Sequence, residues 1–309
     1  MTILMTILVI GRVWPGWRHI TRRGGETMQP PLTSCLIPPG SNPLRTHHRC
    51  LIGLALIVAV GCGEEPSTPD RFEHLFSGNL KVIDLTHSLS ADMPYWPTPH
   101  GNPFRHDTLV AHPDGSPIMA AYFTPEHHGT HIDAPVHSRE GRRPVDALTA
   151  ADLFGPAAVI DVSKQAAANA DYRATLEDFQ AWESAHGRLP TGAIVLLSTG
   201  WSRKWDSIAA YQNLDELGRP HFPGFSDAAA TWLVTERDIH GIGIDDLSVD
   251  YGASSDFAVH GIVNGAGKFH LENVANMHLL PATGAFLIVA PIKIEGGSGG
   301  QVRLFAVIP

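Results

Sequence analysis

Residues 80–309 of this 309-residue chain predict an α/β or α+β domain with a mixed, mostly β core flanked by helices. Six short runs rich in β-branched residues, each bounded by Gly or Pro, predict strands. Two stretches with capping signals and helical spacing predict helices between those strands. The sequence contains no internal repeat, no Gly-rich phosphate loop after a strand and no G-x-S-x-G elbow. The length suits one ordinary domain with room for a small second one.

The predicted strands and helices alternate along the chain. The strands are expected at 80–89, 157–163, 193–199, 241–246, 285–294 and 302–309. Thr175 and Asp178 resemble a capping box, and they open a helix that reaches about His186 and ends at Gly187. Ser226 is the expected N-cap of a second helix, DAAATWLVTER, whose apolar residues share one face.

The composition limits the classes of function. The chain carries 22 Lys and Arg against 31 Asp and Glu, a formal charge of -9. This balance argues against nucleic acid as a partner, because phosphate binding needs a basic surface. The chain holds 18 histidines but three cysteines, Cys35, Cys50 and Cys62. A disulfide framework and a Cys-rich zinc knuckle are therefore excluded downstream of residue 62, and the histidines are left to explain.

Residues 1–62 differ chemically from the rest and predict an export signal. They carry six Arg and one Glu, which leaves 16 basic and 30 acidic residues for 63–309. The apolar run 51–60 is shorter than the roughly 20 residues of a membrane-spanning helix, but it fits the core of a signal peptide. Cys62, followed by the polar linker 63–79, resembles the lipidated cysteine of bacterial lipoproteins. We therefore expect an exported protein, either periplasmic or held at the membrane through Cys62.

Two other interpretations of this region stay open. The apolar run 51–60 could be a buried strand or a short core helix, with Cys62 an incidental buried thiol. The stretch before Leu44 has no sustained periodicity and contains Met28, so it could also be an over-extended gene start. In that case a cytoplasmic location is expected.

One segment, HHGTHIDAPVH at 127–137, has the chemistry of a metal site. His127, His131, Asp133 and His137 all occupy odd positions, so an extended strand would present their side chains on one face. Two imidazoles and a carboxylate on one face are ligands of a first-row divalent ion, and the lack of thiolates favours Zn or Mn. Such an ion activates water for attack on a carbonyl group. We expect His137 to shuttle protons rather than to bind the metal.

A simpler alternative for this segment is a solvated His-rich turn, but four aligned polar groups within 11 residues favour the metal site. The segment resembles the H-x-G-T-H-x-D-x-P-x-H signature of the cyclase family of metal-dependent hydrolases, which includes bacterial kynurenine formamidase and isatin hydrolase. The likeness extends over nearly all of 80–309. LLSTGW at 196–201 resembles the family's L-L-R-T-G-W, with Ser198 in place of Arg, and GIDDLSVDYG at 243–252 resembles its G-I-D-T-x-S-x-D stretch.

The resemblance implies the fold and the ligands of one or two ions. The implied fold is a swivelling β/β/α domain that associates as a homo-oligomer, a dimer or larger. The first ion would be bound by His127, His131 and Asp133. The second would be shared by Asp133, His260 and Glu272. The residues alone do not single out His260 or Glu272, which lie in a mixed segment.

The resemblance also implies the reaction and the substrate contacts. The expected substrate is a small aryl amide cleaved at its C–N bond. The arylformamidase reaction on N-formylkynurenine, in tryptophan catabolism to kynurenine, is the first expectation, and isatin hydrolase-like opening of a cyclic aryl amide is the alternative. The implied proton donor or acceptor is His137. The implied aromatic substrate contact is Trp96, and Trp201 and Phe225 are further candidates for which core packing is the alternative.

Two functions of other classes are kept as alternatives. A non-haem Fe(II) oxygenase would use His131, Asp133 and a distant histidine as a facial triad. It needs a jelly-roll fold, against which the interleaved helices argue. A non-catalytic lipoprotein would use the same fold to bind a small aromatic ligand or a metal, but the complete ligand set together with His137 disfavours it.

Overall fold

A computed structural model describes residues 80–110 and 118–308. The export segment, Cys62 and the linker 63–79 lie outside these residues, so they stay predictions. Within the described part of the chain, no helix is both long enough and apolar enough to cross a membrane.

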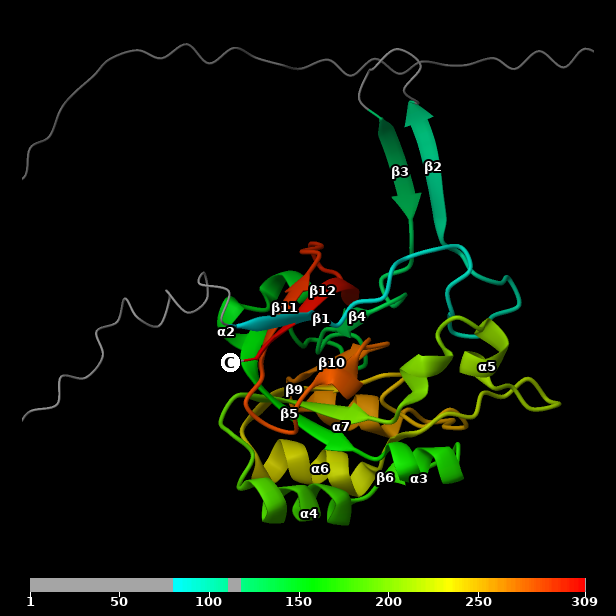
Figure 1. The fold of residues 1–309 in the computed structure, drawn as a ribbon. Helices are drawn as coiled ribbons and strands as arrows, with labels where there is room; N and C mark the ends of the chain where they lie inside the picture. The colour runs from blue at the N-terminus through cyan, green and yellow to red at the C-terminus, as the bar shows by residue number, and fades with distance from the viewer. Residues whose placement is uncertain (1–79, 111–117, 309) are drawn as a thin grey trace, which may run out of the picture. The chain divides into compact units, whose positions relative to one another are not determined.

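An eight-stranded mixed sheet forms the core of the domain (Figure 1). Its strands, in spatial order, are β1 (Lys81–Asp84), β12 (Gly299–Ile308), β11 (Phe286–Pro291), β5 (Phe154–Asp161), β7 (Ala193–Ser198), β9 (Ile239–Ile244), β10 (Phe269–Glu272) and β4 (His131–Asp133). β4 also pairs with β12, so the sheet closes on itself into a barrel-like layer. β5, β7, β9 and β10 are mutually parallel, as expected of strands joined by crossovers.

Helices cover the outer face of the parallel strands. The helical segments are η1 (Val145–Ala147), α2 (Ala150–Leu153), α3 (Ser163–Ala168), α4 (Leu176–His186), η2 (Trp201–Lys204), α5 (Ile208–Gln212), α6 (Asp227–Glu236), α7 (Ala258–Gly265) and η3 (Met277–Leu279). α4 and α6 lie along one side of the sheet (Figure 1). Phe179 of α4 and Leu233 of α6 pack there against Ile160 and Val195, while Val159 and Leu196 point into the opposite core. Both faces of these strands are therefore buried, which explains their continuous apolar runs.

Both predicted helices are confirmed, together with their caps. The Thr175 N–H donates to the Asp178 carboxylate at 2.7 Å, and Gly187 ends α4 with a φ of 88°. The Ser226 hydroxyl accepts the N–H of Ala229 at 3.2 Å, and α6 ends at Glu236. Each capping residue and its partner lie within one turn at the end of their helix, so the local sequence is enough to predict the cap. The mixed α/β fold class is confirmed as well.

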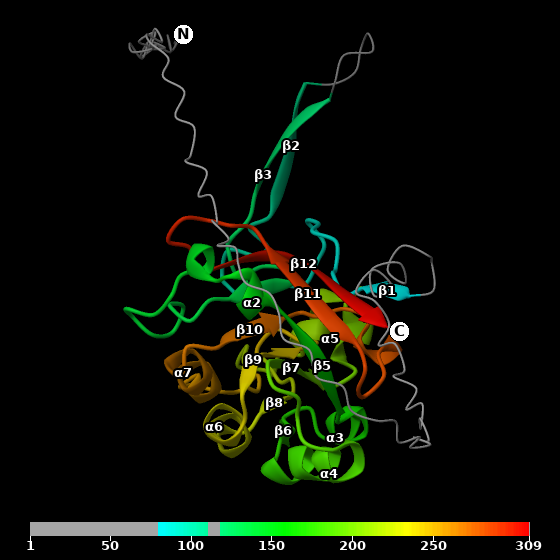
Figure 2. The same cartoon turned by 90° about the vertical axis from the view of Figure 1, so that its left-hand side faces the viewer.

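Several elements were not predicted. The strand expected at 80–89 ends at Asp84. α7 was missed because it holds Gly261 and Gly265, and a β-carbon at Gly261 would lie 2.6 Å from a guanidinium nitrogen of Arg139. Short strands β6 (Arg173–Ala174) and β8 (Gly224–Phe225) pair in parallel. The strands β2 (Arg105–Val110) and β3 (Met119–Phe123) form a separate antiparallel hairpin, which extends away from the barrel in Figures 1 and 2.

Candidate metal centre and active site

Two neighbouring strands supply four side chains of the site. β4 and β10 are antiparallel, with His131 directly opposite Glu272 and Asp133 opposite His270. Alternate residues of a strand share one face, so these four side chains point to the same side. Ile132, between His131 and Asp133, points the other way into the apolar core and is fully buried. The register of one strand pair therefore brings the imidazoles and carboxylates together.

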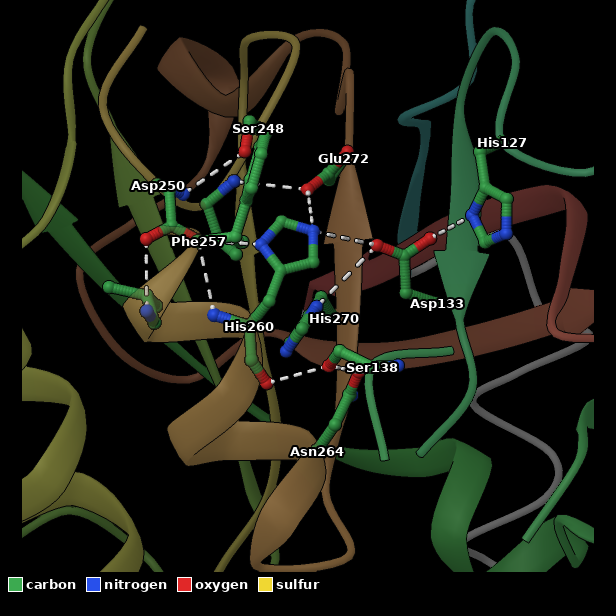
Figure 3. A network of polar contacts seen from close by, with 12 residues as sticks. His127, Asp133, Ser138, Ser248, Asp250, Phe257, His260, Asn264, His270 and Glu272 are labelled. Atoms are coloured by element: carbon green, nitrogen blue, oxygen red, sulfur yellow. Dashed lines mark hydrogen bonds and ion pairs between the residues drawn. The ribbon is translucent and has the colours of Figure 1, made fainter. Parts of the chain in front are cut away.

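The two carboxylates lie close to the ring nitrogens. His131 Nε2 is 3.2 Å from Asp133 Oδ1 and 3.4 Å from Glu272 Oε2. His260, on α7, places its Nε2 3.4 Å from Asp133 Oδ2 and 3.4 Å from Glu272 Oε1 (Figure 3). All four side chains are buried. In each carboxylate, one oxygen atom therefore faces His131 and the other faces His260.

His127 reaches this cluster from the loop before β4, not from the strand. Gly129 has a φ of +65°, a left-handed conformation that favours glycine, and it turns the chain between His127 and β4. His127 Nδ1 lies 2.5 Å from Asp133 Oδ1, and its Nε2 lies 2.8 Å from Ser298 Oγ. The expectation that the whole motif lies on one strand face is thus corrected: His131 and Asp133 share the face, and the turn delivers His127.

His137 follows the turn after β4 and lies exposed beside the same cluster. Its ring centroid is 3.9 Å from that of His127 and 5.6 Å from that of His260. Ligand atoms of His127, Asp133 and His137 all lie within 4.8 Å of one another. The structure therefore brings His137 to the candidate metal site, in a position open to solvent.

The cluster fits a divalent cation. His131 Nε2 and Asp133 Oδ2 are buried without a hydrogen-bond partner among the described residues, which is costly unless another group binds them. Burial lowers the pKa of His131, but the neighbouring Asp133 and Glu272 outweigh burial and raise that pKa to about 10. The carboxylates thus favour positive charge at this point. Imidazole and carboxylate ligands without a thiolate suit Zn or Mn.

His270 is a further ligand candidate that the sequence reasoning missed. The side chains of Asp133, His260, His270 and Glu272 form one group with ligand atoms within 4.8 Å of one another. Both ring nitrogens of His270 are buried and have no hydrogen-bond partner within the described part of the chain, and Nδ1 lies 3.5 Å from Asp133 Oδ2. The spacing of His270 and Glu272 in the sequence could have indicated it, because residues two positions apart in a strand point to the same face.

Asp250 orients His260 and was also missed. Its Oδ2 lies 2.6 Å from His260 Nδ1, within hydrogen-bond distance (Figure 3). The same carboxylate accepts the backbone N–H groups of Val259 and His260 at 2.9 and 3.1 Å, in the first turn of α7. With Nδ1 engaged in this way, Nε2 faces Asp133 and Glu272 and is free to bind a metal ion.

We expect Asp250→Asn to weaken metal binding roughly 10–100-fold, because the carboxylate that holds the His260 ring is lost. The measurement is a metal titration of the purified protein by calorimetry. Asp227→Asn, at an exposed position on α6, is the matched control and should bind metal as the unaltered protein does. Equal affinities in the two variants would show that Asp250 does not orient the ligand.

Gly299 has no side chain, and the His127 ring occupies the space that a side chain at this position would fill. β12 pairs with β4 so that Gly299 lies opposite Asp133. A β-carbon at Gly299 would lie 2.6 Å from His127 Cε1 and 2.5 Å from the carbonyl oxygen of Ile132. Both distances are shorter than real contacts, so a side chain at this position must displace the ring or the strand.

Gly299→Ala is therefore expected to lower kcat/KM about 100-fold, the typical cost of a shift of about 1 Å at a catalytic centre. Steady-state kinetics give the effect, and a thermal melt reports the fold. Gly265→Ala on α7 is the control, because its β-carbon would lie no closer than 3.4 Å to the flexible side chain of Arg139. Full activity of Gly299→Ala would contradict the assigned position of His127.

The polar cluster lines a pocket of about 360 Å³, within the size range of small-ligand sites. Trp96, Leu247 and Phe257 supply apolar lining. The ring centroids of Trp96 and Phe257 lie 5.8 Å apart, and the two side chains are 37% and 41% exposed, so they border the opening. Phe257 has a φ of 49°, a strained conformation for an aromatic residue, three positions before His260.

Trp201 and Phe225, the other two predicted substrate contacts, do not line this pocket. Trp201 is buried beside Tyr211 and Phe222, and its Nε1 donates to the Tyr211 carbonyl at 2.8 Å. Phe225, on β8, is fully buried and stacks on Phe179 with centroids 5.8 Å apart. These two residues pack the core, while Trp96 lines the pocket, and contact with a substrate stays a prediction.

The Cyclase family model matches residues 83–251, more than half of the chain, and the chain belongs to this family. Its relatives and structural neighbours are metal-dependent hydrolases, and it has a buried His/Asp/Glu cluster that could hold a metal ion, so the protein is an enzyme of that class.

Relatives within the family include two hydrolases. The chain is 34% identical to isatin hydrolase of Roseibium aggregatum over 252 residues, which covers 76% of this chain and 94% of the relative. It is 30% identical to kynurenine formamidase of Bacillus cereus over 224 residues, which covers 72% of this chain and 94% of the relative. The solved structure of isatin hydrolase A from Ralstonia solanacearum matches with a TM-score of 0.74 and 35% identity, over 80% of this chain and 99% of that one. The resemblance inferred from the motif is confirmed.

Proposed function

We propose that this enzyme hydrolyses the C–N bond of a cyclic aryl amide of the isatin type. The observation that carries the proposal is the likeness to isatin hydrolase, which is longer and closer than the likeness to kynurenine formamidase. The apolar, aromatic-bordered pocket beside the ligand cluster is consistent with a flat aryl substrate. N-formylkynurenine, the first expectation from the sequence, becomes the second candidate.

In this proposal, the metal ligands are His127, His131, Asp133, His260 and Glu272, with Zn or Mn as the ion. The bound ion supplies Lewis acidity toward the amide carbonyl and lowers the pKa of water. His137, exposed on the pocket side, accepts a proton from the attacking water and returns it to the leaving nitrogen. Water adds across the C–N bond: oxygen joins the carbonyl carbon and a proton joins the nitrogen. Trp96 and Phe257 hold the aryl ring at the opening of the pocket.

The test compares two substrates on the purified full chain loaded with Mn or with Zn. We expect isatin to be opened with a higher kcat/KM than N-formylkynurenine is deformylated. The reverse order would assign the enzyme to the arylformamidase reaction. Turnover of neither substrate by metal-loaded protein would contradict the proposal and favour a binding role. The Fe(II) oxygenase alternative loses its basis, because the described sheet is a closed mixed barrel with parallel strands.

We propose that the chain is exported and anchored through a lipid on Cys62, as the sequence of residues 51–62 suggests. Cys62→Ala is expected to move the protein from the membrane fraction to the soluble fraction, because the lipid attachment point is lost. Fractionation with mass spectrometry of the mature N-terminus is the measurement, and Cys35→Ala is the control. An unprocessed N-terminus on protein found in the cytosol would rule out the anchor.

A further inference from the structure

Glu126 and Ser298 lie beside the metal cluster, and neither belongs to the proposed ligand set. Glu126 directly precedes His127, and Ser298 directly precedes β12. The Glu126 carboxylate accepts the N–H and the hydroxyl of Ser298 at 2.9 and 2.6 Å. It also accepts the N–H of Gly299 at 3.2 Å. One oxygen atom of this half-buried carboxylate, Oε2, thus accepts all three donors.

The single hydrogen atom of the Ser298 hydroxyl has its direction set by these contacts. A carboxylate only accepts, so this hydrogen lies between Ser298 Oγ and Glu126 Oε2. The same Oγ lies 2.8 Å from His127 Nε2. Because the hydroxyl hydrogen is already used, Oγ accepts at this contact, and Nε2 carries the hydrogen. In the neutral ring the other nitrogen, Nδ1, then holds a free electron pair, and it faces Asp133 (Figure 3).

His131 and His260 are held the opposite way round. His131 Nδ1 donates to the Gly129 carbonyl oxygen at 2.9 Å, and His260 Nδ1 lies 2.6 Å from the Asp250 carboxylate. Their Nε2 atoms therefore face the two carboxylates of the cluster. In each of the three imidazoles, one nitrogen is engaged by the protein and the other is left for a cation. His127 differs from the other two in which nitrogen is left.

We propose that Glu126 and Ser298 are positioning residues that fix the tautomer of His127. In this arrangement His127 binds metal through Nδ1, whereas His131 and His260 bind it through Nε2. A hydrogen bond donated by the outer ring nitrogen also holds the ring in place and raises the basicity of the ligand nitrogen. Both residues act through the His127 ring. This assignment rests on the proposed function only in taking the three histidines as ligands.

The loop that carries His127 is held against β12 by contacts that do not involve the Ser298 hydroxyl. The Gln301 side-chain amide donates to the carbonyl oxygens of Pro125 and Glu126 at 2.7 and 3.1 Å. The backbone N–H of Ser298 also reaches Glu126 without the hydroxyl. Removing the hydroxyl alone should therefore leave the loop attached. A variant at this position consequently tests the His127 ring rather than the fold.

The first experiment measures Zn binding to the full chain by calorimetry. Ser298→Ala is expected to weaken binding roughly 10–100-fold, the usual effect of losing the partner of a ligand histidine. Ser184→Ala, at an exposed position on α4, is the matched control and should bind as the unaltered chain does. Glu126→Gln keeps an acceptor oxygen for the hydroxyl and should lose less affinity than Glu126→Ala. Unchanged affinity in Ser298→Ala, or equal losses in the two Glu126 variants, would overturn the proposal.

The second experiment identifies the ligand atoms directly. Nitrogen NMR of the Zn-loaded full chain, with labelled histidine rings, distinguishes a metal-bound Nδ1 from a metal-bound Nε2. We expect one Zn-bound ring with the metal at Nδ1 and hydrogen at Nε2, and this ring should change tautomer or lose Zn in Ser298→Ala but not in Ser184→Ala. Zn-bound rings that all bind through Nε2 would overturn the proposal. Neither readout involves a substrate, so failure to turn over isatin would count against the proposed function and leave the ligand atoms as assigned.

Discussion

Asp133→Asn should abolish hydrolysis and lower metal affinity by at least about 100-fold, beyond the effect of losing a residue that only orients a ligand. Its Oδ1 faces His127 at 2.5 Å and His131 at 3.2 Å, and its Oδ2 faces His260 at 3.4 Å. The amide has nearly the same shape, so the change removes the central negative charge of the site without opening a cavity. The fold should therefore be retained while the cation is lost.

The measurement is the metal content per chain by elemental analysis, together with kcat/KM on isatin. Asp227→Asn serves as the control once more, because it removes an exposed carboxylate from α6. Full metal content together with unchanged kcat/KM would remove Asp133 from the site. Loss of activity with full metal content would instead limit its role to orienting His127 and His131.

His137→Asn should lower kcat about 100- to 10,000-fold, the usual contribution of a general acid–base group, and leave the metal content unchanged. The side chain is exposed beside the cluster, with its ring 3.9 Å from that of His127, so it can exchange protons with solvent. This combination separates proton transfer from ligation, because a ligand would lose metal and activity together.

Pre-steady-state kinetics and elemental analysis of the same preparation check this prediction. His278→Asn, at an exposed position in η3, should leave both quantities as they are. If His137→Asn loses metal in proportion to its activity, His137 belongs to the ligand set with His127 and Asp133, a grouping that its distance also allows.

The parts of the fold that the sequence predicted depend on near neighbours in the chain. α4 and α6 begin at Thr175 and Ser226, whose capping partners lie three residues away. His131 and Asp133, the candidate ligands on β4, are two residues apart, and any strand would bring them to one face. Contacts between residues this close in the sequence can be predicted without knowing the tertiary structure.

The remaining parts depend on pairings between distant segments. The alternation of His270 and Glu272 is visible in the sequence, but the register that sets β10 opposite β4, and so brings His270 to the site, is not. Trp96 and Trp201 have the same chemistry, and tertiary packing alone decides that one borders a pocket and the other is buried. His260 was placed by the family resemblance, since its helix begins at a strained Phe257 and contains glycines.

β4 is a strand of three residues, yet it is hydrogen-bonded to β10 on one edge and to β12 on the other. It therefore closes the barrel, and two of its three residues, His131 and Asp133, are the proposed metal ligands. We expect an ion bound there to hold β4 between its two neighbours and to add about 2.7 kcal/mol to the stability of the folded state when its concentration is 100 times its Kd. We therefore expect chains without a bound metal ion to open first at β4 and to be degraded first by proteases.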